Sequence, residues 1–192
     1  MAEALPAADG LILAGGQGRR VHEADKGLLT WRGRTLVEQV AARLAPQVHR
    51  LIISANRNAA RYATYGDVVG DATDWGDWPG PLGGLAAGLA ACRQPWLVCV
   101  PCDTPLIPPD LAARLIGGAS GAGAALAVAA SQGRRHAVCM ALRVTLLDNL
   151  RAGLDAGERK VGRWQDQAGA VEVAFDDLPA AFLNLNTPAD FS

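Results

Sequence analysis

The first half of the chain alternates short aliphatic runs with amphipathic stretches, and this alternation constrains the fold more than any other feature of the sequence. Aliphatic runs at residues 11–14, 51–54 and 96–100 are separated by segments of helical character at 36–44 and 85–92. Strands that alternate with helices are typical of a mostly parallel sheet with helices on both of its faces. The predicted fold class is therefore α/β, with three layers built around a mostly parallel central sheet.

The order of the predicted elements becomes less regular after Asp103. We predict a helix at 109–115, strands at 124–130, 137–142 and 171–175, and further helices from Thr145 onward. The later strands are expected to be antiparallel additions to the sheet. Residues 71–84 are rich in glycine, proline and tryptophan and are predicted to form one long loop, a feature that often carries function in compact domains.

The length and charge of the chain exclude several classes of protein. A chain of 192 residues has the length of a single domain and can bury an ample core. Its 18 basic and 19 acidic side chains lack the charge excess that a nucleic-acid or membrane-surface binder normally shows. The apolar run 119–130 is shorter than the roughly 20 residues that span a bilayer, and residues 1–9 lack the basic start of a secretory signal. We expect a cytoplasmic protein with no nucleic-acid or membrane partner.

Four cysteines at irregular positions predict no disulfide framework, which suits a reducing compartment. Cys99 and Cys102 form a CxxC motif, and this motif makes a redox or zinc function an alternative. There is no second CxxC, and a predicted buried strand runs through Cys99. A structural role is therefore favoured.

The sequence LILAGGQGRR at residues 11–20 runs from an aliphatic strand directly into three glycines and two arginines. Ligands bind at the carboxyl ends of strands in an open parallel sheet, and glycines there let backbone amides approach phosphate oxygens. Arg19 supplies planar donors for such oxygens, Lys26 is close enough to bind the same anion, and Asp25 is placed to orient Lys26. The stretch is neither the dinucleotide fingerprint nor a P-loop. Its alternative explanation is a surface turn with solvated charges.

A second polar site follows the aliphatic run at 96–100, in the sequence VCVPCDTP. A carboxylate at the carboxyl end of a strand, in the same sheet as the glycine-rich loop, is well placed to hold Mg2+ against phosphates. Asp103 is the predicted metal ligand. Taken alone, this aspartate would be better explained by an Asx turn or a cap ahead of residues 108–110, so its pairing with the glycine-rich loop decides the interpretation.

Several ordered motifs together resemble one known family. They are LAGGQGRR with Asp25-Lys26-Gly27, then Ser54-Ala-Asn56-Arg57, Pro79-Gly80-Pro81-Leu82, Pro101-Cys102-Asp103-Thr104-Pro105 and Asn184-Leu-Asn186-Thr187-Pro188. From about residue 11 to residue 188 the chain resembles the molybdenum cofactor guanylyltransferases. The resemblance implies a Rossmann-like nucleotidyltransferase fold, GTP and Mg2+ as ligands, and transfer of GMP onto the phosphate of molybdopterin.

The resemblance also assigns roles to individual residues. The nucleotide site would contain Leu13, Ala14, Gly15, Lys26, Asn56, Asp71 and Asp103. The turn at 79–84 would lie near the nucleotide, Asp103 would bind both GTP and the metal, and Asn184 and Asn186 would face the pterin phosphate or the metal. Taken singly, the asparagines and Asp71 would be explained as turn, cap and strand residues. The single domain 1–192 would comprise a nucleotide-binding half at about 10–106 and an acceptor-binding half at about 107–192.

The implied reaction needs no general base. The acceptor is a phosphate monoester whose second pKa is about 6, so it is mostly ionised near neutral pH and attacks the α-phosphorus directly. Catalysis then consists of aligning two phosphates, neutralising their repulsion and stabilising the departing pyrophosphate. Arg19, Lys26 and Asp103 are the predicted catalytic residues.

Two basic segments are further candidates for the acceptor side. His136 follows two arginines and would add positive charge there, although a lone histidine beside a strand is more often structural. Arg159 and Lys160 offer similar charges, although a charged run is usually a solvated face. We keep His136 and Arg159 as acceptor-binding candidates.

Two loop segments have open interpretations. Trp75 and Trp78 would either stack on a planar ring or pin the long loop to the core. The family usually has a pattern like RMGG-x-DK, whereas residues 20–26 here read RVHEADK, without the glycines and with Glu23, which would repel phosphate. We expect residues 21–24 to sit differently from those of the family.

Three alternative functions stay open at this point. The nearest is an enzyme of the same fold with another substrate, a cytidylyltransferase for the same cofactor or a sugar-phosphate nucleotidyltransferase, although LAGG rather than LAAG resembles the GTP-using branch. The others are a non-catalytic carrier of the molybdenum cofactor and a CxxC redox protein. We expect a monomer that uses GTP and molybdopterin or Mo-molybdopterin and makes transient contact with molybdenum cofactor insertion proteins or apo-molybdoenzymes.

Overall fold

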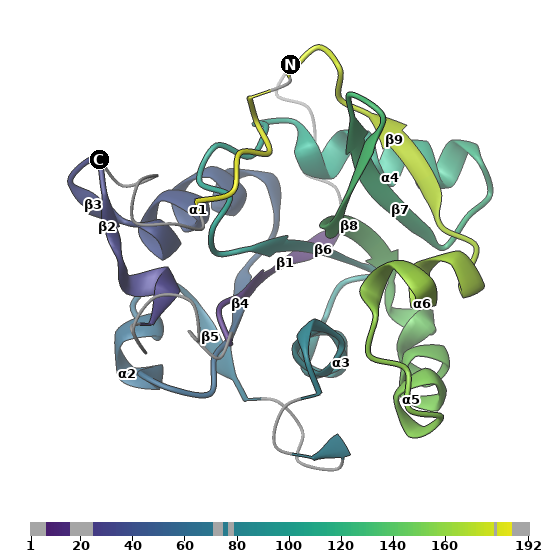
Figure 1. The fold of residues 1–192 in the computed structure, drawn as a ribbon, viewed down its shortest axis with the longest axis horizontal. Helices are drawn as coiled ribbons and strands as arrows, with labels where there is room; N and C mark the ends of the chain where they lie inside the picture. Colours follow the sequence, from purple (N-terminus) through teal and green to yellow (C-terminus); the bar gives the residue numbers. More distant parts are fainter. Residues whose placement is uncertain (1–6, 16–24, 71–74, 77–78, 179, 186–192) are drawn as a thin grey trace.

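The computed structural model of the protein describes residues 7–15, 25–70, 75–76, 79–178 and 180–185. Within these residues the main sheet has seven strands in the order β5-β4-β1-β6-β8-β7-β9. The strands are β1 (Ala8–Leu13), β4 (Leu51–Ser54), β5 (Asp67–Val69), β6 (Trp96–Pro101), β7 (Leu126–Ser131), β8 (Arg134–Arg143) and β9 (Val171–Ala174). One sheet therefore joins strands from both halves of the sequence (Figure 1).

Helices cover the sheet on both faces, which gives the three layers that the alternation predicts (Figure 1). On one face lie α1 (Leu36–Leu44) and α4 (Leu111–Gly121), and on the other lie α3 (Pro81–Ala91), α5 (Leu147–Asp155) and α6 (Val161–Gln167). Along β6, the side chains of Val98 and Val100 belong to the core on the α1 face of the sheet, whereas those of Leu97 and Cys99 belong to the core on the α3 face. The strand reads as a continuous apolar run because both of its faces are buried.

The helix predicted at 36–44 has these bounds in the structure. Its apolar side chains at 36, 37, 40, 41 and 44 are buried, and the Thr35 side chain accepts a hydrogen bond from the Glu38 amide at the amino end. The strand predicted at 51–54 likewise corresponds to β4.

The predicted loop at 71–84 is wrong at its end, because Pro81 begins α3. Proline is well suited to the first position of a helix, where its missing amide hydrogen is not needed. The glycines that suggested a turn instead permit close packing: a Cβ on Gly83 would stand 2.1 Å from the Pro79 ring. Small residues at this point therefore belong to a tightly packed helix start.

The expectation that the later strands are antiparallel holds for β8, which is antiparallel to both β6 and β7. It is wrong for β9, which pairs parallel with β7. The reason lies in the connection between β8 and β9. β8 ends at Arg143, beside Trp96 at the start of β6. The helices α5 and α6 then return the chain to the edge of the sheet where β7 begins. The last strand must therefore run in the same direction as β7.

Several short elements carry no clear signal in the sequence. Thr30–Trp31 and Arg34–Thr35 form the hairpin β2-β3, in which Arg32 and Gly33 have positive φ angles of 48° and 81°. Further short elements are the helix α2 (Ala59–Tyr62) and the 3-10 turns η1 (Lys26–Leu28), η2 (Ala45–Gln47) and η4 (Val144–Leu146). None of the helices within the described residues has the length and apolar character needed to span a membrane.

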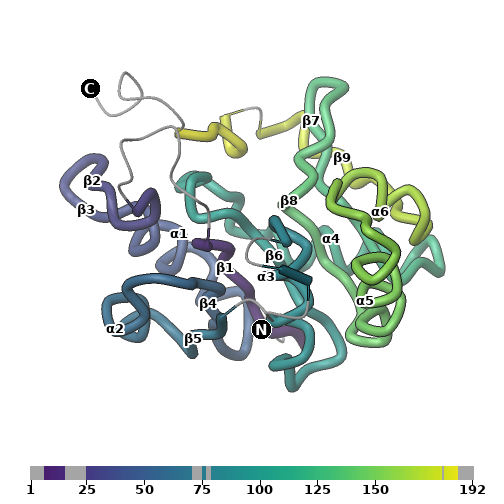
Figure 2. Tube along the Cα trace, turned by 60° about the horizontal axis from the view of Figure 1, so that its bottom comes forward, coloured from purple at the N-terminus to yellow at the C-terminus, as the bar shows by residue number. Residues whose placement is uncertain are grey.

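The chain changes direction within the sheet at β1. From β1 it proceeds to β4 and β5 on one side, whereas β6 pairs with the other side of β1 (Figure 2). Leu13 is thus in register with Ser54 of β4 and with Pro101 of β6. Ligands of open α/β sheets bind outside the carboxyl ends of the strands at such a switch point. The fold places the candidate site at the ends of these three strands.

Candidate active site

The glycine-rich end of β1 lies between the ends of its two neighbours. The Ala14 amide donates to the Ser54 carbonyl at 2.9 Å, and the Cys102 amide donates to the Leu13 carbonyl at 3.0 Å. A Cβ placed on Gly15 would lie 3.5 Å from Asn56 Nδ2, which is ordinary contact, so the protein's own packing does not require glycine there. The structure thus brings together the predicted nucleotide residues at 13–15 and Asn56, and Gly15 leaves its backbone open to a ligand.

Lys26 and Asp103 meet across the same edge of the sheet. Lys26 Nζ lies 2.5 Å from Asp103 Oδ2, and the two side chains are 22% and 16% exposed. The sequence suggested that Asp25 would orient Lys26. In the structure Asp25 instead accepts hydrogen bonds from the Tyr62 hydroxyl and, at 2.9 Å, from Asn58 Nδ2. These two bonds hold the turn from which Lys26 reaches the carboxylate.

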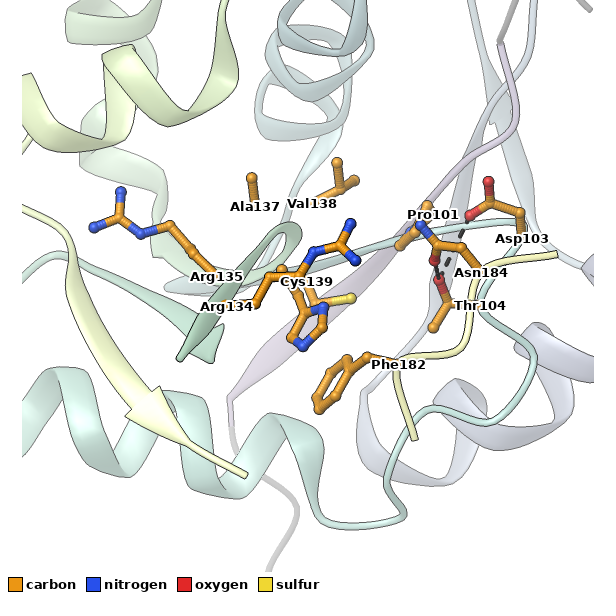
Figure 3. Close-up of a pocket in the computed structure, with 11 residues that line it drawn as sticks. Pro101, Asp103, Thr104, Arg134, Arg135, Ala137, Val138, Cys139, Phe182 and Asn184 are labelled. Atoms are coloured by element: carbon orange, nitrogen blue, oxygen red, sulfur yellow. Dashed lines mark hydrogen bonds between the residues drawn. The ribbon is translucent and has the colours of Figure 1, made fainter. Parts of the chain in front are cut away.

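A cavity of about 270 Å³ opens on the other side of Asp103 from β1, between the end of β6 and the start of β8 (Figure 3). Its lining combines charged, polar and aromatic side chains: Pro101, Asp103, Thr104, Arg134, Arg135, His136, Ala137, Val138, Cys139, Phe182 and Asn184. Asp103 is therefore shared between the glycine-rich edge and this cavity.

The His136 imidazole is held in the cavity wall by two contacts. Its Nε2 lies 2.7 Å from the Ser131 hydroxyl, and its ring stacks on Phe182 with the centroids 4.3 Å apart. Burial, and to a lesser degree the charge of Arg134, lowers the pKa of His136 from its ordinary 6.5. A lowered pKa favours the neutral imidazole near pH 7 and so argues against the positive charge that the sequence suggested for His136.

The two arginines before His136 have different surroundings. Arg135 donates to Asp166 Oδ1 at 2.6 Å and to Glu172 Oε1 at 2.9 Å, and in Figure 3 it points away from Asp103 and Asn184. These hydrogen bonds raise the pKa of Arg135 against the opposing effect of burial. Arg134 is exposed and has cavity-lining atoms. Among the described residues that line the cavity, Arg134 is therefore the exposed arginine, whereas the charge of Arg135 is offset by two carboxylates.

The cysteine pair has no geometry for redox or zinc chemistry. Cys99 belongs to the core on the α3 face of the sheet, whereas Cys102 belongs to the core on the α1 face. All four cysteines are free thiols, and burial raises the pKa of Cys102 to about 12 and that of Cys99 well above its usual value. A three-residue spacing along an extended strand points the two side chains to opposite faces. Both cysteines fill the core.

Comparison with known proteins identifies the family of this site. A model of the MobA-like NTP transferase domain matches residues 10–170. The molybdenum cofactor guanylyltransferase of Acidovorax ebreus (strain TPSY) is 46% identical over 198 residues, which cover 94% of this chain and 92% of that protein. The chain belongs to the molybdenum cofactor guanylyltransferase family. It is an enzyme of the nucleotidyltransferase class.

Solved structures show the same fold at lower identity. The molybdopterin-guanine dinucleotide biosynthesis protein A of Archaeoglobus fulgidus superposes with a TM-score of 0.78 at 20% identity, covering 95% of this chain and 94% of that one. A Mycobacterium tuberculosis H37Rv protein, solved in complex with manganese, superposes with a TM-score of 0.69 at 21% identity over 98% and 97% of the two chains. The Rossmann-like nucleotidyltransferase architecture that the motifs implied is thus confirmed.

Some residues of the predicted guanylyltransferase site lie outside the described residues. These are Arg19, Asp71 and Asn186, together with Trp78 and the segment 21–24. Their roles stay predictions. Asn184 is described, and it lines the cavity beside Thr104.

Two other candidates are held by contacts away from Asp103. The Arg159 guanidinium donates to the main-chain oxygens of Leu154 and Glu158, and Arg159 is not among the described residues that line the cavity. Trp75 Nε1 donates to Asp155 Oδ1 at 2.7 Å, and its ring packs against the core on the α3 face. Of the two interpretations of Trp75, these contacts favour the one in which it pins the loop.

The Mg2+ that the family resemblance implies can be tested against the donors present. Within the described ranges no group of three or more His, Cys, Asp or Glu residues is placed to hold a metal ion. Mg2+ in nucleotide enzymes is commonly held by one or two carboxylates together with substrate phosphates and water. Asp103, at the switch point and partly exposed, fits a metal that arrives with the triphosphate.

The sequence did not single out three residues that shape the cavity. Ser131 and Phe182 hold His136, and Thr104 contacts Asn184, over separations of 5, 46 and 80 residues. Thr104 lies within the motif at 101–105, which assigned it no role, and Phe182 lies two residues before Asn184 of the last motif, so these positions were the available signal. Ser131 ends a buried strand and carries none.

Proposed function

We propose that the protein transfers GMP from GTP to the terminal phosphate of molybdopterin or Mo-molybdopterin, which yields the guanine dinucleotide form of the cofactor and pyrophosphate. One observation carries this proposal: the glycine-rich edge and the cavity lie on opposite sides of Asp103. A transferase needs two substrate sites that meet at the reacting phosphates. The relatives named molybdenum cofactor guanylyltransferase support the choice of both substrates.

The nucleotide side of the site recognises GTP mainly through the backbone at the end of β1. Gly15 lets the triphosphate approach the main chain, and Leu13 and Ala14 line the same edge. Asn56 follows the neighbouring strand β4 and lies beside Gly15, where it contacts the nucleotide. Asp71 and Arg19 complete this side in our proposal.

Asp103 is the proposed carboxylate ligand of Mg2+, and the triphosphate supplies the remaining charged oxygens. When bound, the metal supplies positive charge that offsets the negative charge of the phosphates and of departing pyrophosphate. Lys26 now lies on Asp103 Oδ2. When GTP binds, Lys26 leaves this oxygen and contacts the phosphates of GTP. The positive charge of Lys26 then lies where pyrophosphate forms.

The transfer is a single displacement at phosphorus. An ionised oxygen of the acceptor phosphate forms a bond to the α-phosphorus of GTP, and the bond from that phosphorus to the bridging oxygen breaks. The electron pair of the broken bond leaves with pyrophosphate, which Lys26 and Arg19 stabilise. No proton has to be removed from the nucleophile, because a phosphate monoester is mostly ionised near pH 7.

The cavity is the proposed acceptor site. Arg134 supplies positive charge for the acceptor phosphate, and Asn184 and Asn186 contact the same group. The neutral His136 ring, stacked on Phe182, provides a flat wall. This uncharged aromatic wall suits the planar ring of the acceptor better than it suits a negatively charged group.

Pyrophosphate release tests this function directly. The enzyme is incubated with GTP or CTP and a divalent metal, with and without molybdopterin. We expect release with GTP only when molybdopterin is present, with a preference over CTP on the order of 100-fold. A preference for CTP would contradict the assignment of the base, and release that does not depend on molybdopterin would contradict the acceptor.

A further inference from the structure

The side chain of Thr104 contacts the side chain of Asn184 in the cavity wall. Its hydroxyl oxygen lies 2.5 Å from Asn184 Oδ1 and 3.5 Å from Asp103 Oδ1 (Figure 3). A hydroxyl carries a single hydrogen and donates one hydrogen bond. A separation of about 2.5 Å lies at the short end of the range for O–H···O bonds and below the range for N–H···O bonds, which begins at about 2.7 Å. The hydrogen therefore goes to Asn184, and the atom that faces Thr104 is the amide oxygen.

This contact fixes which end of the Asn184 amide the cavity receives. The last torsion of an asparagine side chain is broad, so the backbone alone does not orient the amide. The backbone itself is anchored, because the Leu185 amide donates to the Asp103 carbonyl at 3.0 Å and Leu185 is buried beside Trp31. With its oxygen held by Thr104, Asn184 directs its nitrogen away from Thr104, as Figure 3 shows.

An amide nitrogen is a hydrogen-bond donor, so it binds anions and does not coordinate cations. The family resemblance left two roles for Asn184, contact with the pterin phosphate or with the metal. Arg134 lines the same cavity and also favours an anion. We propose that Thr104 is a positioning residue, which orients Asn184 as a donor to the phosphate of the acceptor. This inference rests on the proposed function, because it takes the acceptor to be a phosphate monoester.

The test compares two substitutions that differ by one hydroxyl. Thr104→Val keeps the shape of the buried side chain and removes the donor, whereas Thr104→Ser keeps the donor. Binding of molybdopterin is measured by equilibrium dialysis without GTP and with EDTA, so that no metal takes part. We expect Thr104→Val to weaken this binding about tenfold and to raise the acceptor KM by a similar factor, because a bond to a charged group is lost. Thr104→Ser should restore both values.

Further readouts separate this role from a structural one. The KM for GTP and the thermal unfolding midpoint should stay at their wild-type values in Thr104→Val. Asn184→Asp replaces the donor by a carboxylate that repels phosphate, so acceptor binding should fall further than in Thr104→Val.

Several outcomes overturn the proposal. A defect in Thr104→Val that appears only in the metal dependence would show that Asn184 does not serve the acceptor phosphate. A defect that Thr104→Ser fails to repair would assign Thr104 to packing. If the wild-type protein binds molybdopterin and turns it over while Thr104→Val does so equally well, only the role of Thr104 fails. A wild-type protein that binds no molybdopterin would overturn both this inference and the proposed function.

Discussion

Two ion pairs lie at opposite edges of the strands β1, β4 and β6, and their surroundings differ. One aspartate with a basic partner lies at the amino ends of these strands, and another lies at the carboxyl ends. At the amino ends Asp9 is fully buried and accepts from Arg50 Nε at 3.0 Å and from the Arg93 amide at 2.8 Å. The same Arg50 also donates to Asp67 at 2.6 Å and to the Ala91 carbonyl. This pair ties β1, β4, β5 and the end of α3 together.

At the carboxyl ends the pair of Lys26 and Asp103 borders a cavity and is partly exposed. The two pairs differ in their aspartates, because Asp9 is enclosed by protein, whereas Asp103 is partly exposed and faces space that a substrate can fill. A buried pair with several fixed partners loses stability when one member is removed, whereas a pair beside a cavity can exchange partners when a ligand binds. The surroundings of an ion pair, more than its presence, therefore distinguish a structural pair from a pair in a functional site.

The largest expected effect is the loss of activity in Asp103→Asn. The amide removes the charge that holds Lys26 and that ligates Mg2+ in our proposal, so kcat/KM should fall on the order of 10³-fold. Unfolding in urea should change by less than about 1 kcal/mol, because the pair is partly exposed. Asp110→Asn is the control: this half-exposed aspartate pairs with Arg114 at 3.8 Å and should leave activity unchanged. Near-normal activity in Asp103→Asn would remove Asp103 from the mechanism.

Asp9→Ala tests the opposite end of the sheet. Arg50 would keep its charge and lose its buried partner, so the free energy of unfolding should fall by about 3 kcal/mol. The KM for GTP of the folded enzyme should stay the same. Asp67→Ala removes the exposed partner of the same arginine and should cost less than about 1 kcal/mol. Equal losses in the two variants would refute the distinction between enclosed and exposed partners.

The carboxyl-end site was more predictable from the sequence than the cavity beside it. Gly15 and Asp103 each follow an aliphatic strand directly, so local sequence and the rule for parallel sheets place them at one edge. The helix at 36–44 and the strand at 51–54 were also predicted with their observed bounds, because each has a clear period and clear ends.

The remainder depended on contacts between distant residues. The stacking of His136 on Phe182 and the bond between Thr104 and Asn184 arise only once β8 and the C-terminal segment meet β6. The parallel direction of β9 follows from the path of α5 and α6, which strand pattern alone does not encode. The start of α3 was missed because glycine and proline signal turns, although here they serve close packing.

A pair of glycine substitutions near the two ends of β4 should give a smaller effect than the acidic variants. A Cβ on Gly66 would stand 2.6 Å from the Leu51 carbonyl oxygen, so Gly66→Ala forces a backbone shift and should destabilise the fold by about 2 kcal/mol. Gly15→Ala meets only ordinary contacts and should change stability by less than about 0.5 kcal/mol. GTP affinity, measured by calorimetry, should fall about tenfold in Gly15→Ala and stay unchanged in Gly66→Ala. The reverse pattern would mean that Gly15 serves packing.

The smallest expected effect is a pH dependence of stability that belongs to the carboxyl end. Burial lowers the pKa of Arg50 at the amino end, but its bonds to Asp9 and Asp67 together outweigh this effect and raise the pKa overall, so Arg50 keeps its charge at any pH of interest. His136 differs, since burial lowers its pKa in the folded protein below its ordinary 6.5. As the pH falls through 6.5, the unfolded chain takes up a proton that the folded chain resists, so stability present above this pH is lost below it.

His136→Gln removes this proton uptake, so the variant should not show this loss of stability on acidification. The difference in unfolding free energy between wild type and variant should therefore shrink as the pH falls from 7.5 to 5.5. The change should be no larger than that of an ordinary surface substitution, because the imidazole is only partly buried. Urea unfolding at three pH values measures it, with the exposed His49→Gln at the amino end as the matched variant. A wild-type curve that loses no more stability than His136→Gln on acidification would mean that the imidazole charges freely in the folded protein. His136 would then regain its predicted place as a cation in the proposed acceptor site, and it would add its charge to that of Arg134 in the cavity wall.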